Sequence, residues 1–319
     1  MRLAIVIACL AGFVAPVFAQ EVPPLPRPRP DLEALRGEKP AAPPVSQATP
    51  SAPATAADAV TAIAKPPQPV TLTARVTEQS DAIPAGVVWR VFDTKTDNSG
   101  QLALVAKSEE STARLALSPG EYVVHVAYGR AQSSDTLVVG DDGAEKTIIL
   151  DAGALRLNAA IAGDVPIPVN LLRFDVFGGG EGGEDRTQVA EGLTANDLVT
   201  LNSGTYHIVS YFGDVNAVVR ADLRVEAGQL TDATLYHKAA QVSFKLVSAP
   251  GGEAIADIDW TIKTGDGATV FSAVGAFPAT VLAEGDYLVL AKRGDAVFNR
   301  QFQVKPGRAE EIEVLTTVY

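Results

Sequence analysis

The sequence predicts an all-β protein in which three tandem seven-strand β-sandwiches follow a disordered proline-rich linker. A Gly-x-Tyr motif recurs three times in the later part of the chain at nearly equal spacing. Short apolar stretches separated by turn residues surround each motif, as is typical of β-strands. Of the 21 prolines, 13 fall within residues 20–69. The chain therefore divides into a proline-rich segment and a longer strand-rich part.

Residues 1–19 have the features of an export signal. Arg2 gives a positive start, residues 3–14 are apolar, and a small-residue cleavage pattern ends at residue 19. The apolar stretch is shorter than the roughly 20 residues of a membrane-spanning helix, and we expect no transmembrane segment in the mature chain. We expect export to the bacterial periplasm, with secretion as the alternative. Cys9 formally fits a lipoprotein signal, but the apolar stretch that follows it opposes lipid attachment there.

Residues 20–69 form the predicted linker. They contain one glycine and no aromatic residue, and Ala, Ser, Thr and Gln fill most of the remainder. Such a segment cannot bury enough apolar surface to offset the entropy of ordering it, so we expect it to be disordered. Its prolines favour the extended polyproline II conformation, at about 3.1 Å per residue. The segment is therefore expected to act as a long tether.

One short stretch of the linker differs from the rest. Asp31 is a residue type that caps helix starts, and Gly37 is one that ends helices. Leu32 and Leu35 are three residues apart and would share one helix face. These four residues form a candidate partner-docking motif that folds on binding. The alternative is a transient turn within a spacer.

The strand-rich part contains three copies of one unit. Tyr122, Tyr206 and Tyr287 each follow a Gly-x pair, and they lie 84 and 81 residues apart. In every copy, a second glycine follows the first at a distance of nine residues, at positions 129, 213 and 294. An aromatic strand precedes each tyrosine and begins with Trp89, Phe174 or Trp260. So many shared offsets indicate duplication.

Each copy is predicted to contain seven antiparallel strands. In the first copy they cover 72–76, 87–92, 102–106, 113–117, 122–128, 135–139 and 146–150. Turns every 8–12 residues are typical of an immunoglobulin-like sandwich. The expected sandwiches span residues 70–152, 153–239 and 240–319. Because side chains alternate between faces, the three tyrosines and the aromatic residues at 89, 174 and 260 are expected in the cores.

The stretch Leu117-Ser118-Pro119-Gly120-Glu121-Tyr122-Val123-Val124 resembles the motif of carboxypeptidase-regulatory-like and related bacterial immunoglobulin-like repeats. In those repeats a loop glycine precedes a strand whose tyrosine packs inward. Residues 282–289 fit the same pattern, whereas the second copy departs from it with His207 after the tyrosine. The resemblance implies a non-catalytic adhesion, spacer or accessory role. It carries no site residues to this chain.

The sequence offers no convincing catalytic, cofactor or metal site, and we expect a protein that is not an enzyme. The glycine-rich run at 178–183 contains acidic residue Glu181 and is followed by a strand pattern, so it is predicted to be a hairpin loop rather than a phosphate cradle. His125 and His207 are expected on outward faces of separate repeats, and His237 completes the histidines. The alternative is a calcium site in one of three acidic loops, but the spacing of their residues matches no calcium-binding loop. The residues of these loops are Asp93, Asp97, Asn98, Asp141, Asp142, Glu181, Glu184 and Asp185.

The charge balance excludes some classes of partner. Lys and Arg number 26 and Asp and Glu number 38, for a net charge of −12. The excess of acid falls on residues 70–319, because the charges of the linker cancel. Binding to nucleic acid or to anionic membrane needs the opposite balance. One basic spot, formed by Lys292, Arg293 and Arg300, would dock an acidic partner or offset neighbouring acids.

These features predict an exported, non-enzymatic structural or interaction protein of the bacterial cell envelope, with another envelope protein as its partner. The main alternative is a glycan- or peptidoglycan-binding module, which would require Trp89 and Trp260 to be exposed on one face. A third alternative is an outer-membrane β-barrel. Aromatic residues make up only 6% of the chain, too few for interfacial girdles, and the long repeat does not fit a barrel's strand rhythm.

Overall fold

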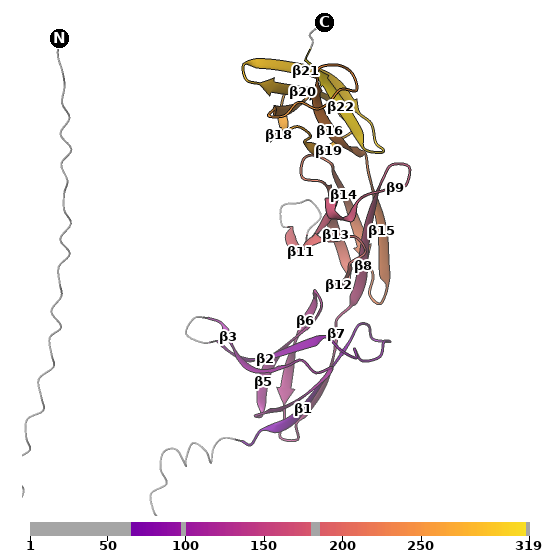
Figure 1. Ribbon diagram of the computed structural model, residues 1–319. Coiled ribbons are helices and arrows are strands. Elements are labelled where there is room, and N and C mark those ends of the chain that lie inside the picture. Colours follow the sequence, from indigo (N-terminus) through magenta and orange to yellow (C-terminus); the bar gives the residue numbers. More distant parts are fainter. Residues whose placement is uncertain (1–64, 97–99, 180–185, 317–319) are drawn as a thin grey trace, which may run out of the picture. The chain divides into compact units, whose positions relative to one another are not determined.

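The structure is a computed structural model that describes residues 65–96, 100–179 and 186–316 (Figure 1). The predicted export signal, the docking motif and the linker up to residue 64 lie outside the described residues. Within these ranges, no helix is both long and apolar enough to cross a membrane.

The first sandwich consists of a three-stranded and a four-stranded sheet. The smaller sheet has the order β4-β1-β7 and the larger one the order β3-β2-β5-β6. The strands are β1 (Gln68–Arg75), β2 (Val87–Thr96), β3 (Leu102–Ser108), β4 (Thr112–Leu117), β5 (Gly120–Tyr128), β6 (Ala131–Val139) and β7 (Ala144–Ile149). All seven predicted strands of this copy are confirmed, several with longer bounds.

The second sandwich repeats this arrangement, with sheet orders β12-β8-β15 and β11-β10-β13-β14. Its strands are β8 (Ala152–Ile161), β10 (Leu172–Gly178), β11 (Thr187–Leu193), β12 (Leu198–Asn202), β13 (Gly204–Phe212), β14 (Val218–Val225) and β15 (Leu230–His237). A two-residue strand, β9 (Val165–Pro166), pairs with β8, and a 3-10 turn, η2 (Val169–Leu171), precedes β10.

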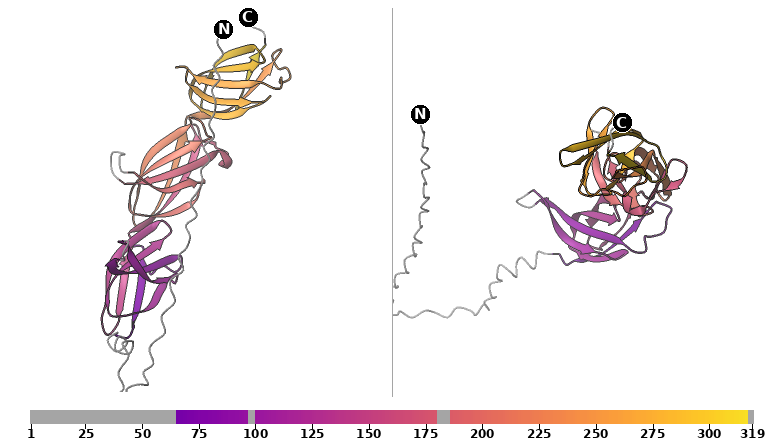
Figure 2. Two further views of the ribbon diagram at one scale, coloured as in Figure 1. Left: turned by 90° about the vertical axis from the view of Figure 1, so that its left-hand side faces the viewer. Right: turned by 45° about the horizontal axis from the view of Figure 1, so that its top comes forward.

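The third sandwich has the orders β19-β16-β22 and β18-β17-β20-β21. Its strands are β16 (Ala239–Val247), β17 (Asp259–Thr264), β18 (Thr269–Val274), β19 (Ala279–Ala283), β20 (Gly285–Arg293), β21 (Ala296–Val304) and β22 (Glu310–Leu315). The prediction of tandem all-β sandwiches is thus confirmed, and Figure 2 shows each as two facing layers of strands.

The expectation of purely antiparallel strands is wrong for one pair in every sandwich. The first strand of each copy pairs with the last strand in parallel: β1 with β7, β8 with β15, and β16 with β22. Figure 1 shows β8 and β15 running side by side. A parallel pair needs a long crossover, and here five intervening strands supply it, four in the other sheet and one at the edge of the same sheet.

Three separate clusters of buried residues form the cores, one per sandwich. Trp89 and Tyr122 belong to the first cluster, and Trp260 and Tyr287 to the third. Phe174 and Tyr206 belong to the second. All six predicted core aromatics are buried, which confirms the period-two interpretation of their strands.

Each buried tyrosine forms the same hydrogen bond. The hydroxyl of Tyr122 donates to the backbone carbonyl of Ser118 at 2.8 Å. Tyr206 and Tyr287 donate to the carbonyls of Asn202 and Ala283, both at 2.9 Å. In all three cases the acceptor lies four residues before the tyrosine, at the crossing from the small sheet to the large one. A buried phenol needs such a partner, so these bonds fix the crossing.

We expect Tyr206→Ala to lower the free energy of unfolding of the second sandwich by roughly 3–5 kcal/mol, because it removes a buried aromatic ring and its hydrogen bond. Chemical denaturation measures the loss, and hydrogen exchange should place it in the amides of strands β8 to β15. The matched control is Tyr236→Ala in the same sandwich, because the Tyr236 side chain is 52% exposed. Equal losses in the two variants would contradict the core assignment.

Candidate interaction surfaces

The docking motif predicted from Asp31, Leu32, Leu35 and Gly37 lies outside the described residues, and it remains a prediction. The loop residues Asp97, Asn98, Glu181, Glu184 and Asp185 also lie outside them. The acids that the structure does describe sit on the surface. Asp141 makes an ion pair with Lys65 at 2.7 Å, and Asp142 is exposed. Among the described residues, no three His, Cys, Asp or Glu side chains gather in a group that could hold a metal ion.

Two of the histidines lie on the outer faces of strands, as predicted. The His125 Nδ1 atom lies 3.0 Å from the Ser134 hydroxyl, and partial burial with nearby Arg90 lowers the pKa of His125. The His207 Nδ1 atom lies 2.7 Å from an Asp222 carboxylate oxygen. Each pairs with the neighbouring strand, so both are cross-strand contacts within one sheet.

The third histidine is a buried polar group that the sequence did not reveal. His237 is 1% exposed, and its Nε2 atom lies 2.8 Å from the hydroxyl of Ser210, which is fully buried. The ring of Phe212 packs edge-on against the imidazole. Burial lowers the pKa of His237 from 6.5 to about 4, so the ring is neutral at pH 7. Both side chains are closed to solvent. The pair therefore connects β13 to β15 and is not accessible to a substrate.

Neither tryptophan is available as a sugar-binding platform. Trp89 and Trp260 are buried, and their indole N–H groups donate to the backbone carbonyls of Glu110 and Gly275 at 3.0 and 2.8 Å. The glycan-binding alternative required both rings on one exposed face. That requirement is not met.

The first sandwich carries an apolar surface that the sequence did not predict. Leu104 on β3 is 54% exposed, and Val105 and Leu102 are exposed beside it. A hollow of ≈ 510 Å³ adjoins this strand and is lined in part by Phe92 and Val123. Alternation on β3 puts apolar side chains on both faces, which is unusual for a strand with one solvent face.

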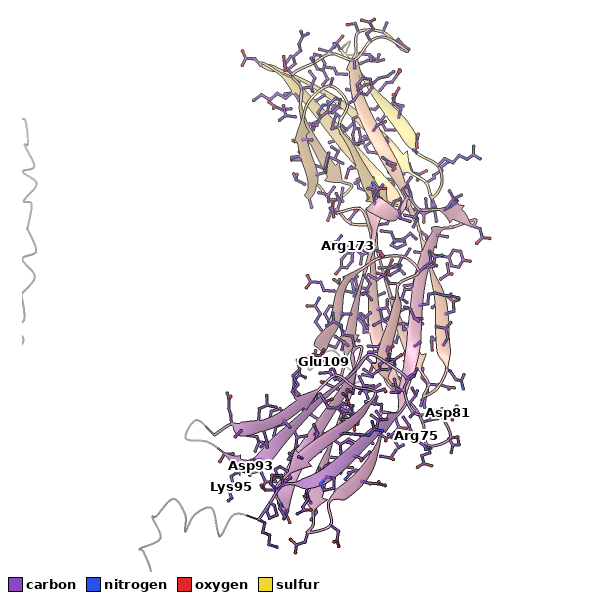
Figure 3. The ribbon with its side chains drawn as sticks, turned by 60° about the horizontal axis from the view of Figure 1, so that its bottom comes forward. Arg75, Asp81, Asp93, Lys95, Glu109 and Arg173 are labelled. Atoms are coloured by element: carbon purple, nitrogen blue, oxygen red, sulfur yellow. The ribbon has the colours of Figure 1, made fainter. Side chains whose placement is uncertain are left out.

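The three residues of the predicted basic spot differ in their contacts. Arg300 donates from Nη1 to the backbone carbonyl of Glu313 at 2.6 Å, which ties β21 to β22. Lys292 and Arg293 are exposed at the turn between β20 and β21. On the first sandwich, Figure 3 shows the half-buried Asp93 beside Lys95, whose backbone N–H donates to the Asp93 carboxylate at 2.9 Å.

The first and second sandwiches contact each other through hydrogen bonds. The backbone N–H of Arg130, in the turn after β5, donates to the carbonyl of Thr200 on β12 at 3.0 Å. The Asn202 side chain bonds the Gln132 backbone twice, accepting from its N–H and donating to its carbonyl, both at 3.1 Å. We call this set the first junction.

The second and third sandwiches contact each other in a related way, which we call the second junction. Asn216, in the turn after β13, donates to the hydroxyl of Tyr287 and accepts from the backbone N–H of Ala283, both at 2.9 Å. Val281 on β19 is 2% exposed and belongs to the core cluster of the second sandwich. Val215 packs in turn against the core of the third.

The two junctions use equivalent positions. Gly129 and Gly213 are the glycines that lie nine residues after the first glycine of their motifs, and both have left-handed φ angles, +61° and +68°. A Cβ atom built on Gly129 would lie 3.1 Å from the Cβ of Thr200, and one on Gly213 would lie 2.7 Å from the Cβ of Val281. Thr200 and Val281 each precede the tyrosine of their own sandwich by six residues. The close approach, as well as the φ angle, therefore requires glycine.

Comparisons with known proteins find one family model that matches part of the chain. Residues 241–316 match the model of the Rhizobiales growth-associated tandem repeat domain. The comparison with curated proteins finds no match.

Solved structures similar to the chain include pilus proteins. The Bacillus anthracis TIE protein is 15% identical over 78% of this chain and 50% of that chain, with a TM-score of 0.22, so the chain spans half its length. The minor pilin GBS52 of Streptococcus agalactiae is 14% identical over 53% of this chain and 95% of that one, with a TM-score of 0.31. A streptococcal ancillary pilin is 12% identical over 79% and 100%, with a TM-score of 0.30. Neither a ligand nor a partner follows for this chain from similarities at this level.

We expect the stability of the second sandwich to fall as the pH is lowered from 6.5 to 4. In this window the unfolded chain protonates His237 and the folded chain does not, so stability rises with pH by up to about 3 kcal/mol across it. Urea denaturation at several pH values measures the slope. The double variant Ser210→Ala/His237→Phe removes both partners and should flatten it. An unchanged slope in that variant would show that other groups cause the pH dependence.

We expect millimolar calcium to leave the melting temperature unchanged, because no described acidic group converges as calcium ligands must. Thermal melts with calcium and with chelator measure this. A rise of several degrees that chelator reverses would show that an acidic loop binds the ion.

Proposed function

We propose that the chain is an exported, non-enzymatic structural and interaction protein of the bacterial cell envelope, periplasmic after removal of residues 1–19. The sandwiches span residues 70–152, 153–239 and 240–319, and residues 20–69 tether them. The match of residues 241–316 to a Rhizobiales growth-associated repeat supports a bacterial origin and a growth-associated role.

The observation that carries this proposal is the pair of junctions. Consecutive sandwiches are joined by backbone and amide hydrogen bonds, and Val281 of the third completes the core of the second. Such contacts couple neighbouring units along the chain, as in other repeat proteins. A chain built this way is suited to spanning a distance and presenting surfaces along it.

The polar side chains of the cores also support a structural role. The buried hydroxyls of the three tyrosines bond the backbone, and the two indole N–H groups do the same. His237 and Ser210 bond each other out of reach of solvent. These groups are therefore committed to holding strands together, and none is presented to a substrate.

The tether supplies the partner contact in this proposal. Folding of Asp31 to Gly37 on an envelope protein would bury Leu32 and Leu35, each worth about 1.5–3 kcal/mol before the ordering entropy is subtracted. Seven residues cannot sustain a helix alone in water, so the motif would be ordered only when bound. The resulting affinity is expected to be micromolar or weaker, as suits a tether.

The test is Leu32→Ser/Leu35→Ser in the full chain, purified from cells after chemical crosslinking in the envelope. We expect the crosslinked partner to be lost, because both apolar contacts are removed. The matched control is Val60→Ser/Ile63→Ser, which changes an apolar pair of the same spacing in the same linker. Retention of the partner by the first variant, or its loss in both variants, would contradict the docking motif and leave the tether as a spacer.

A further inference from the structure

We propose that the protein associates head to tail with copies of itself, the β20–β21 turn of one copy docking on strand β4 of the next. This inference goes beyond the proposed function and does not depend on the linker motif. It follows from the two junctions, which use the same pair of surfaces and leave one of each unused at the two ends of the described chain.

The unused turn belongs to the third sandwich. Gly294 is equivalent to Gly129 and Gly213, and its φ angle of +59° matches theirs. Arg293 pairs with Ala296 across this turn, as Tyr128 pairs with Ala131 in the turn of the first sandwich. A Cβ atom built on Gly294 would meet nothing within 4 Å. Among the described residues, the third turn therefore has the geometry of the first but no surface against it.

Among residues 65–316 as the structure describes them, the receiving surface with no turn against it belongs to the first sandwich. Ala116 on β4 precedes Tyr122 by six residues, the position of Thr200 and Val281 in the other two copies. Val281 is buried under the preceding turn, whereas Ala116 is exposed. Strand β4 is an edge of its sheet, as β12 and β19 are in theirs. An edge strand presents backbone groups that a neighbouring chain can pair with, as Arg130 does with Thr200.

The charges at the two ends are complementary. Lys292 and Arg293 are exposed at the unused turn. Glu121 and Asp142 are exposed at the receiving end, where Gly120 pairs with Val139 beside β4. The two exposed cations of the turn favour an acidic partner, and the opposite end of this same chain provides exposed acids.

Both surfaces also carry charges of the other sign. Asp259, exposed on β17, pairs with Lys292 on β20. Asp295 follows Gly294 on the turn, and Arg114 precedes Ala116 by two residues on the exposed face of β4. Asp141, also at the receiving end, is already paired with Lys65. A second copy can therefore set Arg114 against the acids of the turn, and Glu121 and Asp142 against its basic groups.

The contact is heterologous, because a turn meets a strand edge and not another turn. Heterologous contacts continue into open chains unless the rotation between copies closes a ring. A single turn on one strand edge is expected to bury less than the roughly 1,200 Å² of stable interfaces, so we expect the association to be weak. Anchoring of several copies nearby in an envelope would raise their effective concentration.

Sedimentation velocity of the purified full chain tests the proposal, from about 10 μM to about 1 mM, a range that covers weak association. We expect the average mass to rise with concentration at low salt and to fall when salt screens the charges. Gly294→Asn should weaken association at least about tenfold. Asparagine accepts the left-handed φ angle but adds a Cβ atom, which at the equivalent glycines would lie 3.1 and 2.7 Å from the receiving Cβ.

The matched control is Gly267→Asn. Gly267 lies in the β17–β18 hairpin of the same sandwich, has a φ of +89°, and also has nothing within 4 Å of a built Cβ atom. It is not at the proposed contact, so association should be unchanged. Thermal melts of both variants verify that the third sandwich remains folded.

A charge exchange then identifies the two surfaces. Lys292→Glu/Arg293→Glu and Glu121→Lys/Asp142→Lys should each be monomeric alone, because like charges then face each other. Mixed together, they should associate, since every turn again meets an edge of opposite sign. A wild-type chain that stays monomeric throughout the range would overturn the proposal. So would association that Gly294→Asn leaves unchanged, or mixed variants that remain monomers.

Discussion

The hydrogen bond from each core tyrosine to the carbonyl four residues before it is the contact on which the rest of each sandwich depends. It holds the crossing between the two sheets at one end of the fifth strand. The glycine turn that contacts the next sandwich stands at the other end of that strand. A single strand thus joins the crossing to the junction, and at the second junction Asn216 bonds the hydroxyl of Tyr287 itself. The internal order of one sandwich is thereby linked to its neighbour.

Much of this architecture was predictable from the sequence, because duplication repeats every signal three times. The tyrosines at 122, 206 and 287 and the aromatic residues of the preceding strands gave the cores, and their alternation gave the correct faces. The parallel pairing of first and last strands could not be predicted in the same way. A strand's side-chain pattern reports which faces are buried, but it does not report the direction of the neighbouring strand.

The surfaces were less predictable than the cores. The closing glycines at 129, 213 and 294 were visible as a repeat, yet their role at the junctions depends on residues about 70 positions later in the sequence. His237 and Ser210 lie on different strands, and only the fold brings them together. The prediction of a docking motif at residues 31–37 depends on the local residue pattern alone.

The parallel pairing of the first and last strands determines how a sandwich responds to tension along the chain. Because β1 and β7 run in the same direction, force applied where the chain enters and leaves pulls these neighbours past each other lengthwise. Their hydrogen bonds are evenly spaced and are all strained together, whereas an antiparallel hairpin pulled at its open end yields one bond at a time. The same pairing recurs in β8 with β15 and in β16 with β22. Each unit of the series is therefore built to resist stretching.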